Sequence, residues 1–259
     1  MHPLQGMELV QRAFAAELSG LEDTSHPMRY TSRKSSPRLI TTKDIIETRD
    51  GPVAMIVSVN DHPVAEVDAT KEHQRLDDLL ADPGKQHHRK QGEEQDLQRA
   101  AKVLRVMPNA FLYQYAGPIQ APTGTVARYL FSPNPAFTAP DLETEVLTAM
   151  TGEIWIDPVQ VRVIHLQGSL QNDVEFGWGV LGRLYKGGWI NIDNADIGGG
   201  VWRVVHFQIN MSARVLIRTR IFETTEDQSH FTVVPPTLDY RQAIAMLRSG
   251  SGSAPPGGP

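Results

Sequence analysis

Hydrophobic residues recur at helical spacing in four segments of the chain. Residues 7–20 carry one apolar stripe followed by Gly20, a pattern typical of a short amphipathic helix. A second helix, with Asp68 or Thr70 as the expected N-cap, is expected to end at Asp82-Pro83-Gly84. Residues 86–108 show the same spacing with many more charges, and we expect Pro108 to end this third helix. A last helix is expected after Pro236.

The remaining segments alternate between apolar and polar positions, as β-strands do. Three strands are expected between Met28 and Asn60, where Asp50-Gly51 is a strong hairpin signal. After Asn109 the chain is almost entirely strand-like, which brings the total to about a dozen candidates. One of them covers residues 174–187 as a single strand.

This order of elements predicts an α+β fold with one large antiparallel sheet. A sheet this wide curls, because every strand pair adds right-handed twist. We therefore expect an incomplete barrel, or half-barrel, with helices packed on one face over a cavity. It would be a single domain over residues 1–248 with a helical insert at about 66–106, followed by a disordered Gly/Ser/Pro tail at 249–259.

Composition narrows the possible functions. The chain has 259 residues, enough for a core without staples, and its net charge of −5 argues against nucleic-acid binding. The absence of Cys excludes disulfides, thiol catalysis and iron–sulfur clusters. No apolar run is long enough for a membrane-spanning helix, and the first residues do not read as a signal peptide.

Two glycine-rich segments resemble ligand-binding motifs. Residues 177–182 spell G-x-G-x-x-G, but a strand-like segment follows them where a dinucleotide site needs a helix. Gly177 and Gly179 instead leave room on one strand face for a ligand or a neighbouring backbone. Asp193 and Asp196 precede three glycines, a pattern that fits a hairpin turn and, as the alternative, a calcium site without EF-hand spacing.

Histidine and carboxylate residues offer candidate chemistry on the expected strands. His165 and His206 lie in mid-strand, and their imidazoles would approach each other if the two strands are close in the sheet. Asp157 lies on a nearby strand, on one face with Glu153 and Trp155. Such a cluster would bind a metal or act as a general base, whereas each residue alone is typical of a hydrogen-bonded core group.

Aromatic residues concentrate in the strand-rich half of the chain. They are expected to form the core of the sheet–helix interface, and the alternative is that some line a hydrophobic ligand cavity. The candidate cavity residues are Tyr129, Phe131, Trp155, Gly177, Trp178, Gly179 and Trp202. The chain contains no G-x-S-x-G, S-x-x-K, H-E-x-x-H or P-loop motif, so it does not read as a standard hydrolase, metalloprotease or NTPase.

Several segments together resemble a group of secreted bacterial proteins of acidobacterial type. The segments run from a T-x-x-x-x-E-T-x-D-G hairpin at 42–51, through F-x-P-N-P at 131–135 and G-x-x-W-I-D at 152–157, to G-x-G-x-L-G at 177–182. That pattern is similar to the periplasmic lipoprotein carriers of the Lol type, and it covers most of residues 30–247. The resemblance implies a half-barrel and a periplasmic or secreted location, and it transfers no catalytic residue.

Three functions follow as hypotheses. The first is non-enzymatic binding or carriage of an apolar or acylated ligand, such as a lipid, without a cofactor. The second is a metal-assisted hydrolase of an acyl lactone or ester, with His165, His206 and Asp157 as catalytic candidates and a weakly held calcium ion at Asp193 and Asp196. The third is a structural envelope component that binds a protein through a sheet edge or the helical insert.

Overall fold

The computed structural model describes residues 6–176, 182–215 and 218–250. It has an α+β fold, with five α-helices and one antiparallel sheet of 13 strands that is not closed. The predicted fold class is therefore confirmed. Among the described residues, no helix combines the length and the apolar character needed to cross a membrane.

The chain divides into two compact units. Unit 1 comprises Met1–Glu22 and Leu97–Thr225, and unit 2 comprises Asp23–Asp96 and Glu226–Pro259. The helices are α1 (Met7–Glu22), α2 (Glu66–Ala81), α3 (Pro83–Ala110), α4 (Leu142–Glu145) with a 3₁₀ turn at Val146–Ala149, and α5 (Tyr240–Gly250). The strands are β1 (Met28–Ser36), β2 (Leu39–Ile46), β3 (Val53–Val59), β4 (His62–Pro63), β5 (Phe111–Ala121), β6 (Gly124–Pro133), β7 (Met150–Asp157), β8 (Arg162–Leu170), β9 (Val174–Phe176), β10 (Gly182–Leu184), β11 (Trp189–Asp196), β12 (Trp202–Val215) and β13 (Arg218–Val233).

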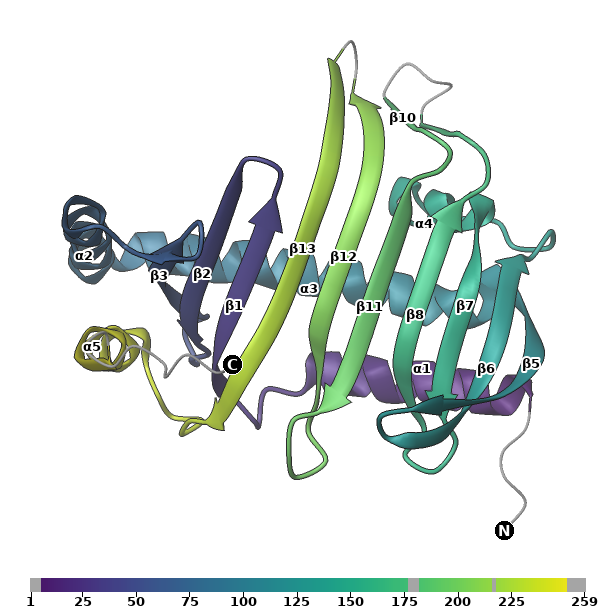
Figure 1. The fold of residues 1–259 in the computed structure, drawn as a ribbon, viewed down its shortest axis with the longest axis horizontal. Helices are drawn as coiled ribbons and strands as arrows, with labels where there is room; N and C mark the ends of the chain where they lie inside the picture. The colour runs from purple at the N-terminus through teal and green to yellow at the C-terminus, as the bar shows by residue number, and fades with distance from the viewer. Residues whose placement is uncertain (1–5, 177–181, 216–217, 251–259) are drawn as a thin grey trace. The chain divides into compact units, whose positions relative to one another are not determined.

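In unit 1 the strand order is β12-β11-β8-β7-β6-β5, and α1 packs on β7 and β8 (Figure 1). The apolar stripe predicted for the first helix is buried there, since Val10 and Phe14 are almost completely inaccessible. They meet the aromatic side chains of β5 and β6, where the rings of Phe111 and Phe131 have their centroids 4.6 Å apart. These side chains form the main core of unit 1, on one face of its sheet.

In unit 2 the strand order is β4-β3-β2-β1, and helices α2 and α5 pack against β3. The outer edge of β3 is partly covered by side chains of α2. The Glu72 carboxylate accepts a hydrogen bond from the Ile56 N–H at 2.9 Å, and Arg75 donates to the Ala54 carbonyl at 2.5 Å. The two side chains also form an ion pair at 2.7 Å, so together they occupy positions that a neighbouring strand would fill.

Two predicted elements were wrong. Pro108 does not end its helix, because α3 continues to Ala110 with the proline inside its last turn. A proline there removes only one hydrogen bond, while the buried Met107 and Ala110 on either side hold the turn against the core. The single strand expected over 174–187 is two short strands, β9 and β10, which pair antiparallel with each other.

Candidate functional site

The candidate site lies on the face of the unit 1 sheet opposite α1, which we call the open face. Alternation along β7 defines it: Ile154 and Ile156 are buried in the core beside α1, so Glu153 and Trp155 point to the opposite side. Polar and aromatic side chains of β6, β7, β8, β11 and β12 share this face because cross-strand partners always do.

One row of the open face contains four of the residues proposed from the sequence: Trp155, His165, Asp193 and His206. The register pairs Arg128 with Trp155, Trp155 with His165, His165 with Asp193, and Asp193 with His206. The two histidines are therefore not adjacent, since β11 lies between their strands and places the Asp193 carboxylate there.

The imidazole of His165 is held from two sides. Its Nδ1 lies 2.6 Å from Oδ1 of Asp193, and its ring centroid lies 4.4 Å from that of the Trp155 indole. The His165 side chain is 13% exposed and that of Asp193 38% exposed, so the pair lies at the surface with the imidazole largely covered. A carboxylate on Nδ1 orients the ring and fixes its tautomer, which is how imidazoles are prepared for proton transfer or for ligand binding.

A second carboxylate, Glu153, is held beside this pair. Arg128 forms an ion pair with Oε2 of Glu153, and its Nε donates to the same oxygen at 2.9 Å. The indole Nε1–H of Trp155 donates to the other oxygen, Oε1, at 2.8 Å. Glu153 and His165 are therefore connected through Trp155, and Glu153 accepts charge-assisted or indole hydrogen bonds on both of its oxygens.

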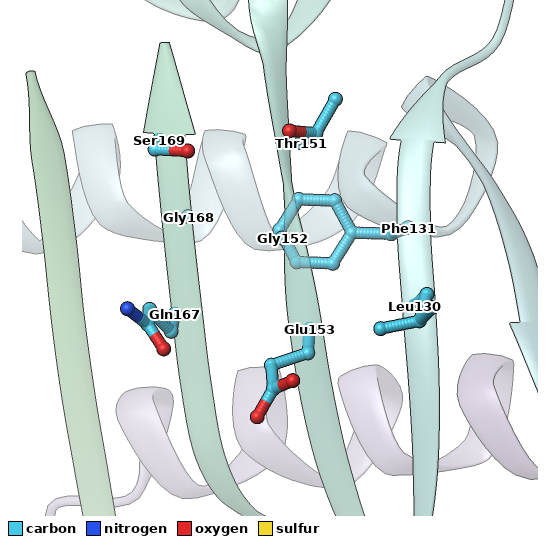
Figure 2. A pocket seen from close by; sticks show the side chains of 8 residues that line it. All are labelled: Leu130, Phe131, Thr151, Gly152, Glu153, Gln167, Gly168 and Ser169. Carbon is cyan, nitrogen blue, oxygen red and sulfur yellow. The ribbon is translucent and has the colours of Figure 1, made fainter. Parts of the chain in front are cut away.

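Next to this network the open face is hollowed. The hollow has a volume of about 390 Å³, and Figure 2 shows the side chains around it, which come from β6, β7 and β8. They are Leu130, Phe131, Thr151, Gly152, Glu153, Gln167, Gly168 and Ser169. Leu130 supplies an apolar wall, whereas Glu153, Gln167 and Ser169 supply hydrogen-bonding groups.

Two paired glycines contribute only backbone to the lining of the hollow, and the side chains they lack would point to the core side, toward Phe131 and Met150. Gly152 and Gly168 are cross-strand partners, and a Cβ on Gly152 would lie 1.9 Å from the Gln167 carbonyl oxygen and 2.7 Å from Cζ of Phe131. The Phe131 ring is packed over both glycines. At Gly152 the contacts are with backbone of the neighbouring strand, so the close approach requires glycine there, whereas a Cβ on Gly168 would mainly meet the Met150 side chain.

The proposed cavity residues do not share one surface. Tyr129 and Phe131 belong to the core beside α1, with 2% and 3% of their surface exposed. The Tyr129 hydroxyl accepts a hydrogen bond from the Gly6 N–H, and burial raises its pKa. Trp202 is buried in a separate small cluster with Val126 and Ile164, against which Trp155 packs. Gly177, Trp178 and Gly179 lie outside the described residues.

The remaining candidate carboxylates serve the backbone of their own turns. Asp157 ends β7, where its Oδ1 accepts from the N–H groups of Val159 and Gln160 at 2.7 and 3.0 Å. Asp196 accepts from the Gly198 N–H at 2.8 Å. Over residues 6–176, 182–215 and 218–250, no group of three or more His, Asp or Glu side chains is placed to hold a metal ion.

Sequence reasoning missed the residues that shape the hollow. Arg128, Leu130 and Gln167 were not singled out, and Glu153 was noted only as a neighbour of Asp157. Alternation was a usable signal, because each of these residues lies next to a core position on its strand. Which of them meet across strands depends on the register.

Comparison with solved structures finds distant likenesses that extend along nearly the whole chain. A putative outer membrane lipoprotein-sorting protein domain from Vibrio parahaemolyticus matches at a TM-score of 0.34 and 8% identity, covering 92% of this chain and 97% of that one. A LolA superfamily protein from Nitrosomonas europaea matches at 0.31 and 9%, covering 89% and 94%. A DUF1329 family protein from Desulfovibrio piger matches at 0.30 and 9%, covering 92% and 97%.

These neighbours agree with the resemblance to Lol-type carriers inferred from the sequence, and they do not bear on the acidobacterial part of it. At such TM-scores and identities they carry no argument about function. No protein-family model matches the chain, and no match was found among curated proteins.

Proposed function

We propose that the chain is a non-enzymatic binding protein for an acylated, amphiphilic ligand in the periplasm or outside the cell. The observation that carries this proposal is the mixed lining of the hollow on the open face. Leu130 offers apolar contact on one side, while Glu153, Gln167 and Ser169 offer hydrogen bonds on the other. Small-molecule sites commonly combine apolar walls with a few polar groups that orient the ligand.

The apolar contribution extends beyond the hollow itself. Leu130 is 41% exposed, and Leu112 on β5 is 55% exposed on the same face, because its register partner is Ser132 and both alternate with core residues. An acyl chain laid across β6 and β5 would cover both leucines. Each methylene removed from water contributes about 0.8 kcal/mol, so contact with the two leucines adds to the binding free energy that the polar groups of the hollow supply.

Displacement of a fluorescent fatty acid from the purified protein tests this proposal. Leu130→Asp is expected to weaken binding at least tenfold, because it places a charge where the acyl chain lies. Leu39→Asp is the matched control, since Leu39 is an equally exposed strand leucine in unit 2, at 48%. Failure of the wild-type protein to bind any amphiphile at micromolar concentration, or equal weakening by both variants, would refute the proposal.

The His165–Asp193 pair favours a second candidate function, hydrolysis of an ester or lactone. An imidazole whose Nδ1 is bound to a carboxylate can take a proton from water at Nε2 and so act as a general base. We expect the wild-type protein to hydrolyse p-nitrophenyl esters or acyl lactones slowly. His165→Gln should abolish this activity, and the control His62→Gln, at an exposed histidine, should leave it intact. A wild-type protein without such activity, or activity that survives His165→Gln, contradicts this second candidate.

A further inference from the structure

A second row crosses the open face beside the His165 row, and its members on four successive strands are all amides or carboxylates. The register pairs Glu153 on β7 with Gln167 on β8, Gln167 with Asn191 on β11, and Asn191 with Gln208 on β12. Neighbouring strands are about 4.8 Å apart, so the four side chains span about 14 Å. We call these four residues the amide row. It begins in the hollow, which contains both Glu153 and Gln167.

The charges around the amide row do not suit an anionic ligand. The two carboxylates in and beside it, Glu153 and Asp193, disfavour a phosphate or carboxylate head. The nearby cation, Arg128, is already paired with Glu153. Carboxamides carry no charge, and each both donates and accepts hydrogen bonds, as a hydroxyl group does.

One atom of the row lacks a partner. Oδ1 of Asn191 is buried and accepts no hydrogen bond from any described residue. Leaving such an acceptor unpaired costs about 1–3 kcal/mol, so a donor from a ligand or an ordered water is expected to reach it. Gln167, which flanks Asn191 on the side of the hollow, is exposed and free to move aside for such a donor.

Aromatic residues flank the amide row on both sides. Trp155 lies in the His165 row, and Trp189 lies in the next row on the other side, because it pairs with Ser169 and Asn210. Both side chains are only half-buried. Indole faces pack against the C–H faces of sugar rings as they do against other apolar surfaces, while the ring hydroxyls remain available for amides.

We propose that the ligand's head is a neutral, hydroxyl-rich group, a sugar or similar polyol, that lies along the amide row between Trp155 and Trp189. This inference rests on the proposed function, because it takes the acyl chain to lie over Leu130. In this arrangement a hydroxyl donates to Asn191, and Gln167 and Gln208 bond its neighbours along the row.

Two probes with the same dodecyl chain and different heads test the inference: dodecyl maltoside and dodecyl phosphate, each below its micelle-forming concentration. Isothermal titration of the wild-type chain is expected to show dodecyl maltoside binding about tenfold more tightly, which corresponds to about one net hydrogen bond. Gln167→Met should remove most of that preference, because it weakens dodecyl maltoside more than dodecyl phosphate. Gln120→Met, an exposed glutamine of β5 outside the row, should change neither.

The possible failures are distinguishable. If neither probe binds, the proposed function fails and this inference fails with it. If both bind equally, or dodecyl phosphate binds more tightly, amphiphile binding stands and the neutral head is refuted. If Gln167→Met lowers both affinities to the same extent while its thermal unfolding matches the wild type, the amide row does not distinguish the two head groups. That result refutes the inference.

Discussion

Replacing Gly152 by alanine tests whether the close approach of β7 and β8 is as tight as described. The added Cβ would lie 1.9 Å from the Gln167 carbonyl oxygen and 2.8 Å from the Gly168 Cα. Both are backbone atoms of the neighbouring strand, so no side-chain rotation relieves the contact. The Phe131 ring, 2.7 Å away, blocks displacement toward the core.

The loss of unfolding free energy expected for Gly152→Ala can be bounded from similar substitutions in other proteins. Overpacking a close-packed region by a methyl group destabilises proteins by about 1–3 kcal/mol, and contact with backbone rather than side chain places this case at the upper end. At an urea m-value of about 2 kcal/mol/M, that loss lowers the midpoint by roughly 1 M or more. The same change should weaken amphiphile binding, because Gly152 lines the hollow and its displacement would shift the neighbouring strands.

Urea unfolding followed by tryptophan fluorescence is a suitable assay, because all four tryptophans belong to the unit 1 sequence. Gly92→Ala is the matched control: no atom lies within 4 Å of its added Cβ, and the residue is inside α3. There alanine should stabilise the helix by up to about 1 kcal/mol, which far-UV circular dichroism can follow. A Gly152→Ala protein as stable as the wild type would refute the close approach.

Three further changes probe other parts of the chain. Phe131→Ala should cost about 3–5 kcal/mol of unfolding free energy in urea, because it empties a buried aromatic position, and a loss below 1 kcal/mol contradicts its burial. Glu72→Ala should uncover the edge of β3 and raise light scattering at high protein concentration, whereas the exposed Lys71→Ala should not. Burial raises the pKa of Glu17 above 4.5 against the opposing effect of Arg162, so the folded state binds the extra proton. The urea midpoint should therefore fall as the pH rises through that raised pKa, and Glu17→Gln should remove this dependence; an unchanged slope contradicts it.

Local signals in the sequence predicted the elements whose determinants are local. The Asp50-Gly51 pair lies between β2 and β3 as expected, and Gly51 has a φ of +93°, which suits glycine. The amphipathic stripe of α1 and the charged helix α2 also begin and end within a few residues of their predicted bounds. The strand-rich second half of the chain predicted the fold class, because apolar–polar alternation in closely spaced strands is compatible with few other architectures.

Signals that depend on tertiary packing misled the prediction. Pro108 normally marks a helix end, but buried neighbours keep it inside the last turn of α3. The sequence does not distinguish the aromatic residues of β6 from Trp155 of β7. In the structure Tyr129 faces the core and Trp155 faces the opposite side. Alternation within each strand separates these two sets, but the pattern of hydrophobic positions alone does not say which set α1 covers.

The row that contains His165 shows why candidate sites are harder to predict than folds. Two β-bulges border it: Ile164 is skipped in the pairing of β7 with β8, and Val205 in the pairing of β11 with β12. Each bulge shifts the register by one residue and so decides which side chains meet beyond it. Ile164, which the first bulge leaves without a register partner on β7, packs in a cluster with Val126 and Trp202. Bulges leave little trace in a single sequence, so the His165–Asp193 contact had to be seen in the structure. The sequence placed His165 in mid-strand but assigned Asp193 to a turn, whereas Asp193 lies within β11.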